Sequence, residues 1–181
     1  GNIFLTLRPE LTASVVRAFN QHNLRSLSPT QRLYYIGPLF RRERPQKGRQ
    51  RQFHQFGIEA FGSNFAEQDA EIMALAWHLL AHFRLTNKID LQVNSIGTSE
   101  CRAGYRDALK QFLKPHFDEL SDISKRRFNT NPLRILDSKN KKEQTILKNG
   151  PKISDYYTKD DKEHFNEVKT YLKAMNIPFT I

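Results

Sequence analysis

The 181-residue sequence contains a single cysteine, Cys101. One cysteine cannot close a disulfide within the chain, and it cannot supply the ligands of a cysteine-rich metal site. A lone thiol is typical of a reducing compartment, so we expect a cytoplasmic protein. The sequence also lacks any apolar run of the length that crosses a membrane, and we therefore expect no membrane partner.

Two glycine-rich phosphate-binding patterns are missing as well. Neither GxxxxGK[ST] nor GxGxxG occurs, which argues against a P-loop and against a dinucleotide-binding fold. Positive charge is abundant: 29 lysines and arginines against 19 acidic residues give a formal net charge of +10. Six of the basic residues fall within eleven positions, namely Arg41, Arg42, Arg44, Lys47, Arg49 and Arg51. Such a cluster indicates a polyanionic partner, a nucleic acid or a nucleotide.

The basic cluster lies in a predicted strand–loop–strand. Residues 32–42 and 51–62 have the composition of β-strands, and the polar loop between them is longer than a tight turn. Side chains alternate between the two faces of a strand, so Arg41, Gln55 and Glu59 point to a polar face while the other face is apolar. Arginines beside a glutamine and a glutamate can hold phosphate together with a second, polar substrate.

Helical periodicity dominates the remainder of the chain. The apolar spacing predicts helices from near Thr12, over 67–84, and from Thr98 or Ser99 to about His116. Shorter helical pieces are predicted near 121–127, 141–149 and 159–176, and extended runs at 3–8, 89–96 and 128–140. The second half of the chain is therefore expected to be mostly helical.

Other candidate sites carry less weight. His54 falls on the apolar strand face, which predicts a hydrogen-bonded core histidine rather than a catalytic base. His78 and His82 have the i,i+4 spacing of a metal pair, but no third ligand is adjacent in the sequence. Nothing around Cys101 indicates a nucleophile. A basic loop alone is also more often a solvated or RNA-contacting surface than an ATP site.

Several longer strings are more specific than composition. FRRERPQKGRQRQFHQFGIEAFG, within residues 37–62, resembles motif 2 of the class II aminoacyl-tRNA synthetases in the form found in the histidyl-tRNA synthetase family. LRPELTA at 7–13 resembles the amino-acid-binding motif that precedes it. LQVNSIG, YRDAL, NPLRILDSKN and DYYTKDDKEHF are similar to the downstream landmarks of that family, in the same order.

The resemblance implies an α/β fold of the α+β type, in which a mostly antiparallel class II sheet is flanked by helices. It places part of the catalytic core at 1–99 and the start of a return strand at 177–181. Between them, residues 100–176 would form a mostly helical inserted subdomain near the tRNA acceptor stem.

The resemblance also implies an activity and its residues. The family activates histidine with ATP, accompanied by Mg²⁺, to histidyl-adenylate and transfers the histidine to tRNA(His). Arg41 is then expected to be the catalytic residue at the ATP α-phosphate, and Arg49 a further ATP contact. The expected histidine-binding residues are Glu10, Thr12 and Gln55 for the α-amino group and Glu59 for the imidazole. The expected contacts to the tRNA acceptor end are Arg44, Lys47 and Arg49, and no metal is expected on protein side chains.

Some features depart from the family. Leu11 stands where glycine is common, and Gln50 where tyrosine is frequent. Both ends of the chain fall inside β-like runs, so we expect a piece of a longer protein, with motif 1 before Gly1. A second histidine-binding segment, motif 3 and an anticodon-binding domain would follow Ile181. The family implies a homodimer, and we expect the isolated piece to be unable to aminoacylate tRNA.

Two other functions remain open. One is an inactive synthetase paralogue that serves as a regulatory subunit or RNA sensor, and the other is a purely basic RNA-binding module. Such paralogues usually lose the arginines and acids of motif 2 and of the amino-acid pocket. Here Glu10, Thr12, Arg41, Gln55 and Glu59 are all present, which favours the enzyme.

Overall fold

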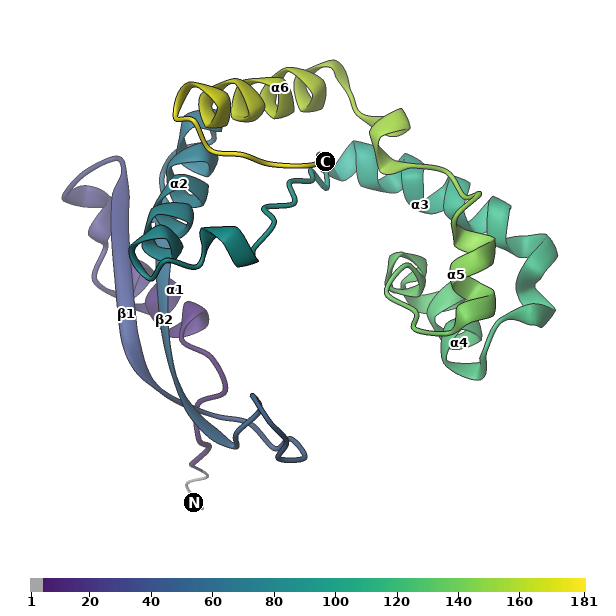
Figure 1. The fold of residues 1–181 in the computed structure, drawn as a ribbon, viewed down its shortest axis with the longest axis horizontal. Helices are drawn as coiled ribbons and strands as arrows, with labels where there is room; N and C mark the ends of the chain where they lie inside the picture. Colours follow the sequence, from purple (N-terminus) through teal and green to yellow (C-terminus); the bar gives the residue numbers. More distant parts are fainter. Residues whose placement is uncertain (1–4) are drawn as a thin grey trace. The chain divides into compact units, whose positions relative to one another are not determined.

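The computed structural model describes residues 5–181, and the chain divides into two compact units, Gly1–Ala76 and Trp77–Ile181. The boundary falls inside the helix α2 (Ala66–His82) (Figure 1). The first unit also holds α1 (Thr12–Gln21), the short 3-10 helix η1 (Leu24–Ser26), β1 (Gln31–Phe40) and β2 (Gln52–Phe61). The second holds η2 (Thr86–Lys88), α3 (Ser99–Leu113), η3 (Lys114–Glu119), α4 (Asp122–Thr130), η4 (Pro132–Ile135), α5 (Lys141–Leu147), η5 (Ile153–Tyr156) and α6 (Lys159–Ala174).

β1 and β2 form an antiparallel hairpin, the long pair of strands in Figure 1. The predicted strands are confirmed, with ends within two residues of those expected. The register places Gly37 opposite Gln55 and Tyr35 opposite Gly57. Aromatic residues and isoleucine recur in both strands, as expected for a pleated and partly covered surface.

The loop between the strands closes in a tight turn. Gln46 and Arg49 exchange backbone hydrogen bonds of 3.2 and 2.8 Å. Gly48 lies between them with φ of 80°, a backbone conformation that glycine adopts without the steric penalty of a side chain. The basic residues of the loop, Arg44, Lys47 and Arg49, are exposed.

One face of the hairpin is covered by α1, and the other is exposed around Tyr34, Ile36 and Phe56. On the covered face, Phe19 of α1 stacks on Phe61 with ring centroids 4.3 Å apart, and Leu39 is fully buried. On the opposite face, Ile36 is 72% exposed. Alternation correctly grouped the apolar residues of that face, but the prediction of a core histidine there is wrong, because His54 is exposed.

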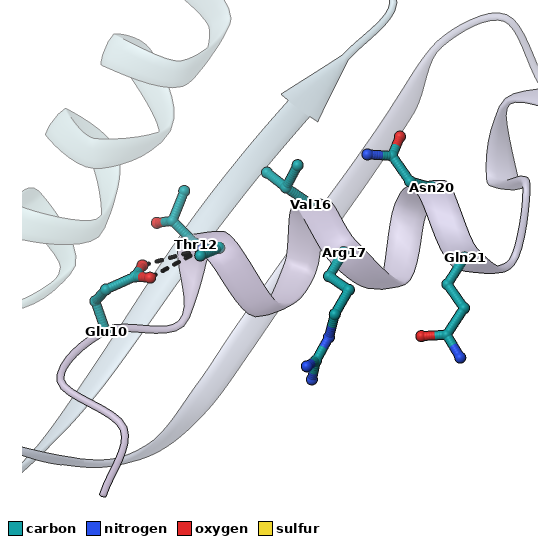
Figure 2. Close-up of a pocket in the computed structure, with 7 residues that line it drawn as sticks. Glu10, Thr12, Val16, Arg17, Asn20 and Gln21 are labelled. Atoms are coloured by element: carbon teal, nitrogen blue, oxygen red, sulfur yellow. Dashed lines mark hydrogen bonds between the residues drawn. The ribbon is translucent and has the colours of Figure 1, made fainter. Parts of the chain in front are cut away.

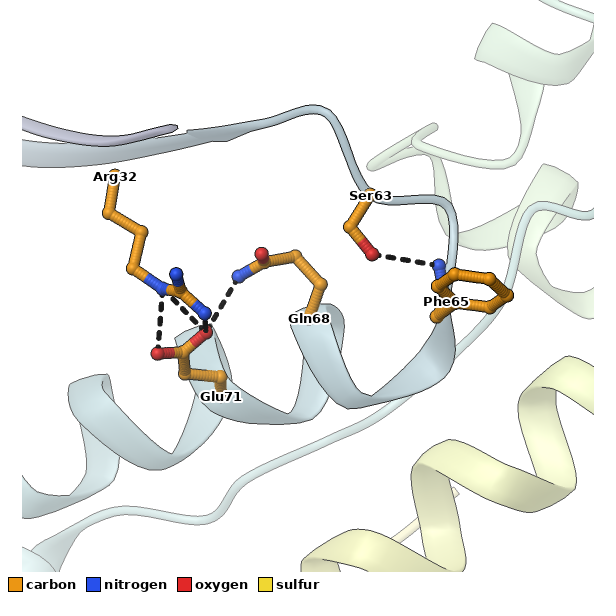
Figure 3. Close-up of polar contacts among 5 residues, drawn as sticks. All are labelled: Arg32, Ser63, Phe65, Gln68 and Glu71. Carbon is orange, nitrogen blue, oxygen red and sulfur yellow. Dashed lines mark hydrogen bonds and ion pairs between the residues drawn. The ribbon is translucent and has the colours of Figure 1, made fainter. Parts of the chain in front are cut away.

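α2 is anchored to the hairpin by an ion pair (Figure 3). The Arg32 guanidinium donates from Nε and Nη2 to the Glu71 carboxylate at 2.8–2.9 Å, and Gln68 donates to the same carboxylate at 2.9 Å. The hydrogen bond from Arg32 holds the pKa of Glu71 below its usual range. Both ends of the pair are about half exposed, so solvent screens it and it orients the helix more than it stabilises the fold.

The second unit is helical around a core formed by Leu109, Leu113, Leu120 and Ile135. Two extended runs predicted from the sequence are wrong. Residues 89–96 form no strand beyond one parallel bridge from Gln92 to Thr180, and 128–140 contains the end of α4 followed by η4. In the first unit, the predicted strand at 3–8 is not regular over 5–8, and its first two residues lie outside the described part of the chain.

Two buried carboxylates connect segments of the second unit. Glu143 is fully buried and accepts hydrogen bonds from the Ser121 amide at 2.7 Å, from Ser124 at 2.9 Å, and from the Ser138 hydroxyl. Asp161 accepts from the backbone amides of Thr98 and Thr158, the residues that precede α3 and α6. The expected division between a catalytic core at 1–99 and an inserted subdomain at 100–176 stays a prediction. The two compact units of the structure meet instead inside α2.

Candidate functional site

The candidate site is built on the covered face of the β1–β2 hairpin. Gln55 and Glu59 are half-buried on β2, and Arg41 follows β1 with its amide bonded to the Arg51 carbonyl at 2.8 Å. The period of two places all three side chains on the face that carries Leu39. The polar face expected from the sequence is therefore the sheltered one.

The segment that precedes α1 closes over this face at Gly37. The Arg8 Nε donates to the Pro38 carbonyl at 2.9 Å. A Cβ atom on Gly37 would lie 3.1 Å from the Arg8 guanidinium and 3.5 Å from the Leu11 side chain. Glycine thus permits the close approach, and because Gly37 pairs with Gln55, the approach brings residues 8–11 beside the centre of the site.

Arg41 is fixed by the same segment. Its Nε donates to the Pro9 carbonyl at 3.0 Å, and its guanidinium lies 5.0 Å from the centroid of the Phe53 ring. The hydrogen bond to the Pro9 carbonyl and the contact with the Phe53 ring together restrict the orientation of the Arg41 guanidinium. Arg41 nevertheless remains exposed and available to an anion.

Arg41 and Arg49 line one pocket of about 490 Å³. Its other lining residues are Glu43, Gly48, Gln50 and Phe53. The Arg49 guanidinium lies 3.6 Å from the Glu43 carboxylate, an ion pair that sequence reasoning missed. Charge alternation in the string was the available signal, but only the turn at 46–49 brings the two side chains together. Arg44 and Lys47 are exposed in the same loop.

Glu10 and Thr12 line a second pocket, of about 920 Å³, that extends along the length of α1 (Figure 2). The Glu10 carboxylate accepts from the Ala13 amide at 3.1 and 3.2 Å. This hydrogen bond satisfies one of the backbone amides that have no partner within the first turn of α1. Figure 2 shows Val16 and Asn20 on one side of the helix and Arg17 and Gln21 on the other, so this pocket is an open surface.

Leu11, the departure from the family pattern, causes no backbone strain. Its φ is −119°, which any residue adopts, and the side chain is buried. It packs toward Gly37 and does not line the pocket of Glu10 and Thr12.

Gln55 holds the one unsatisfied buried side-chain polar atom among the described residues. Its Nε2 donates to the Tyr35 hydroxyl at 3.5 Å, whereas its Oε1 is buried without a hydrogen-bond partner. An unpaired buried acceptor costs about 1–3 kcal/mol, so it marks a position where a donor is missing. Gln55 and Glu59 line neither of the two pockets above. Both lie on β2, between the loop and Phe61, which stacks on α1.

Residues 5–181 contain neither a metal-binding cluster nor a helix fit to cross a membrane. No three or more histidine, cysteine or acidic side chains there gather as they would around a metal ion, so His78 and His82 gain no third ligand. No helix in this range has the length and apolarity of a membrane span. Cys101 is buried, and burial raises the pKa of its thiol, which disfavours the nucleophilic thiolate.

The chain matches known proteins along its whole length. The family model described as histidyl-tRNA synthetase matches residues 2–179. The chain is 49% identical to the histidine–tRNA ligase of Latilactobacillus sakei over 183 residues, and 49% identical to that of Lactiplantibacillus plantarum over 184. Both alignments include 100% of this chain but only 42% and 43% of those proteins.

A solved structure agrees. The apo S. aureus histidyl-tRNA synthetase superimposes with a TM-score of 0.73 at 35% identity, over 96% of this chain and 40% of that one. The predicted fold, a class II synthetase fold of the α+β type, is confirmed by this match. The chain spans less than half the length of these relatives.

Proposed function

This chain belongs to the histidyl-tRNA synthetase family, and from that premise we propose that its full-length protein is a histidine–tRNA ligase. The enzyme activates histidine with ATP to histidyl-adenylate and transfers the histidine to tRNA(His). One observation carries the proposal: the unpaired Gln55 Oε1 lies on the same sheltered face as the Arg41 guanidinium. The acceptor suits an ammonium group, and the guanidinium suits a phosphate.

Arg41 is the proposed catalytic residue. The histidine carboxylate attacks the α-phosphorus of ATP, the bond to the β-phosphate bridging oxygen breaks, and pyrophosphate leaves. Negative charge spreads over the α-phosphate oxygens during this exchange, and a guanidinium already held by Pro9 and Phe53 stabilises it without reorganising. Arg49 holds the outer phosphates from the loop.

Mg²⁺ belongs to ATP in this proposal. It prefers oxygen ligands and keeps several waters, so it binds through the phosphates rather than through a cage of side chains. The pocket of Arg41 and Arg49 fits the phosphates because its donors are cationic and exposed.

Histidine is held on the other side of the site. Glu10, Thr12 and Gln55 are the proposed partners of the α-amino group, and Glu59 receives an imidazole N–H. A site built around a donor rejects analogues that lack it, because its own acceptor is then left unpaired. The buried Oε1 of Gln55 is an acceptor of this kind.

We propose that Arg44, Lys47 and Arg49 contact the acceptor end of tRNA(His), since all three are exposed in the loop. Residues 100–176 are proposed as the inserted subdomain near the acceptor stem. A homodimer of the full-length protein and a cytoplasmic location are proposed from the family alone. Sedimentation of the full-length protein tests the first.

ATP–pyrophosphate exchange by the full-length protein tests the function. We expect exchange that requires histidine. Exchange without histidine, or no exchange at all, would contradict the proposal. A protein that shows no exchange but still binds tRNA would instead fit the regulatory paralogue or the RNA-binding module.

A further inference from the structure

Tyr35 lies beside Gln55, although no sequence motif singles it out. Tyr35 pairs with Gly57 across the hairpin, so it is the diagonal neighbour of Gln55 on the covered face. Diagonal neighbours lie within reach of aromatic side chains. The Gln55 Nε2 donates to the Tyr35 hydroxyl at 3.5 Å, which is longer than a typical N–H···O hydrogen bond.

The position of the Tyr35 ring depends on Gly57. A Cβ atom at Gly57 would lie 2.2 Å from both Cζ and the hydroxyl oxygen of Tyr35. No such contact is tolerated, so the ring occupies the space over the β2 backbone that a side chain would fill. Because Gly57 stands between Gln55 and Glu59 on one face of β2, the hydroxyl is held between the two proposed histidine-binding side chains.

The amide of Gln55 has two ends with opposite chemistry. Its NH₂ group donates, and its oxygen only accepts. With the NH₂ group directed at Tyr35, the oxygen is left buried and unpaired. A bound ammonium, which only donates, pairs the oxygen and leaves both ends of the amide satisfied. The reversed amide would present NH₂ to the ammonium, and no hydrogen bond could form.

We propose that Tyr35 is a positioning residue that turns the Gln55 oxygen toward the α-ammonium of histidine. The inference rests on the proposed function and adds to it the origin of the selectivity for an amine. Tyr35 acts through Gln55. Without the hydroxyl, the buried NH₂ group has no acceptor, and the amide loses its preferred orientation.

Tyr35→Phe in the full-length protein tests this role by histidine-dependent ATP–pyrophosphate exchange. We expect the KM for histidine to rise about fivefold to tenfold, the effect of one lost hydrogen bond. The KM for ATP should stay unchanged, and kcat should fall by less than the KM rises. Tyr34→Phe is the matched control, because it removes the same hydroxyl from a neighbour that is 77% exposed on the opposite face. Its constants should equal those of the wild type.

A second measurement separates positioning from general support of the pocket. The inhibition constant of 3-(imidazol-4-yl)propionate, which is histidine without its amino group, should be the same for the wild type and Tyr35→Phe. Gly57→Ala displaces the Tyr35 ring without removing its hydroxyl. It should likewise weaken the binding of histidine and leave the binding of the analogue unchanged.

The role of Tyr35 would be overturned if both variants bound histidine and the analogue more weakly by the same factor. A KM for histidine in Tyr35→Phe equal to that of the wild type would overturn it as well. In either case histidine-dependent exchange by the wild type would leave the proposed function standing. Absence of that exchange in the wild type would overturn the proposed function and this inference together.

Discussion

Arg41 is the residue on which the proposed chemistry depends most directly. Replacing it with alanine in the full-length protein should lower the kcat of ATP–pyrophosphate exchange by about 100-fold or more, the usual effect of removing one donor to a transition state. The KM for histidine should change little, because Arg41 faces the phosphates. Steady-state exchange kinetics measure both constants.

Arg42→Ala provides the control at the residue scale. Arg42 is an equally exposed arginine, and strand alternation directs it to the opposite side of the chain. The Arg42→Ala variant should retain a rate of ATP–pyrophosphate exchange near that of the wild type. If the two alanine variants lost activity equally, general positive charge rather than the fixed position of Arg41 would explain the effect.

Among the elements, α3 and α6 share one carboxylate at their first turns. Asp161 accepts from the Thr98 amide at 2.7 Å and from the Thr158 amide at 2.9 Å, and it completes a capping box with Thr158. Asp161→Ala leaves both helix starts without this acceptor, so we expect it to lower the free energy of unfolding by about 2–4 kcal/mol. Urea denaturation measures the change.

The neighbouring residue offers a close comparison. Asp160 also lies in the first turn of α6 but is exposed, and Asp160→Ala should cost at most about 1 kcal/mol through the helix dipole. An equal loss in the two variants would show that first-turn charge, and not the shared hydrogen bonds, stabilises these helices.

Glu143 makes the stability of α4 and α5 depend on pH. Burial disfavours its charged form, but hydrogen bonds from Ser138, Ser121 and Ser124 outweigh burial and hold the pKa of this carboxyl below its usual range. A depressed pKa in the folded state contributes stability above the unfolded pKa, and that contribution is lost as the pH falls through the folded value. The free energy of unfolding should therefore decrease as the pH is lowered below about 4–5.

Glu143→Gln should be less stable than the wild type at pH 7 and should lose less stability on acidification. Urea unfolding at a series of pH values from neutral to about 3 provides the measurement. Parallel pH profiles for the variant and the wild type would mean that Glu143 is not a source of the acid sensitivity.

At the scale of the whole molecule, the chain holds only part of the expected site. It spans 42% of the Latilactobacillus sakei histidine–tRNA ligase, and the family's second histidine-binding segment and motif 3 are not recognisable in its sequence. We expect the 181 residues alone to form no histidyl-adenylate and to aminoacylate no tRNA. Single-turnover adenylate formation with the isolated chain, beside the full-length protein, tests this, and robust product from the chain would refute it.

Local patterns predicted a large share of the fold and of the candidate site. Alternation grouped Arg41, Gln55 and Glu59 on one face of the hairpin, because the period of two needs only neighbouring residues. It could not find Tyr35, whose proposed role depends on its diagonal contact across the hairpin. Glu43 was missed for a similar reason, since its partner Arg49 approaches only when the loop turns.

The sequence by itself determined the family, the hairpin and the main helices, because motif strings and the periods of strands and helices are properties of contiguous residues. Only the tertiary structure decided which face of the hairpin is covered, leaving Ile36 72% exposed, and that 89–96 makes one bridge instead of a strand. It alone showed that the Gln55 oxygen is buried without a donor. Burial and pairing depend on segments far apart in the chain, and no local pattern records where those segments meet.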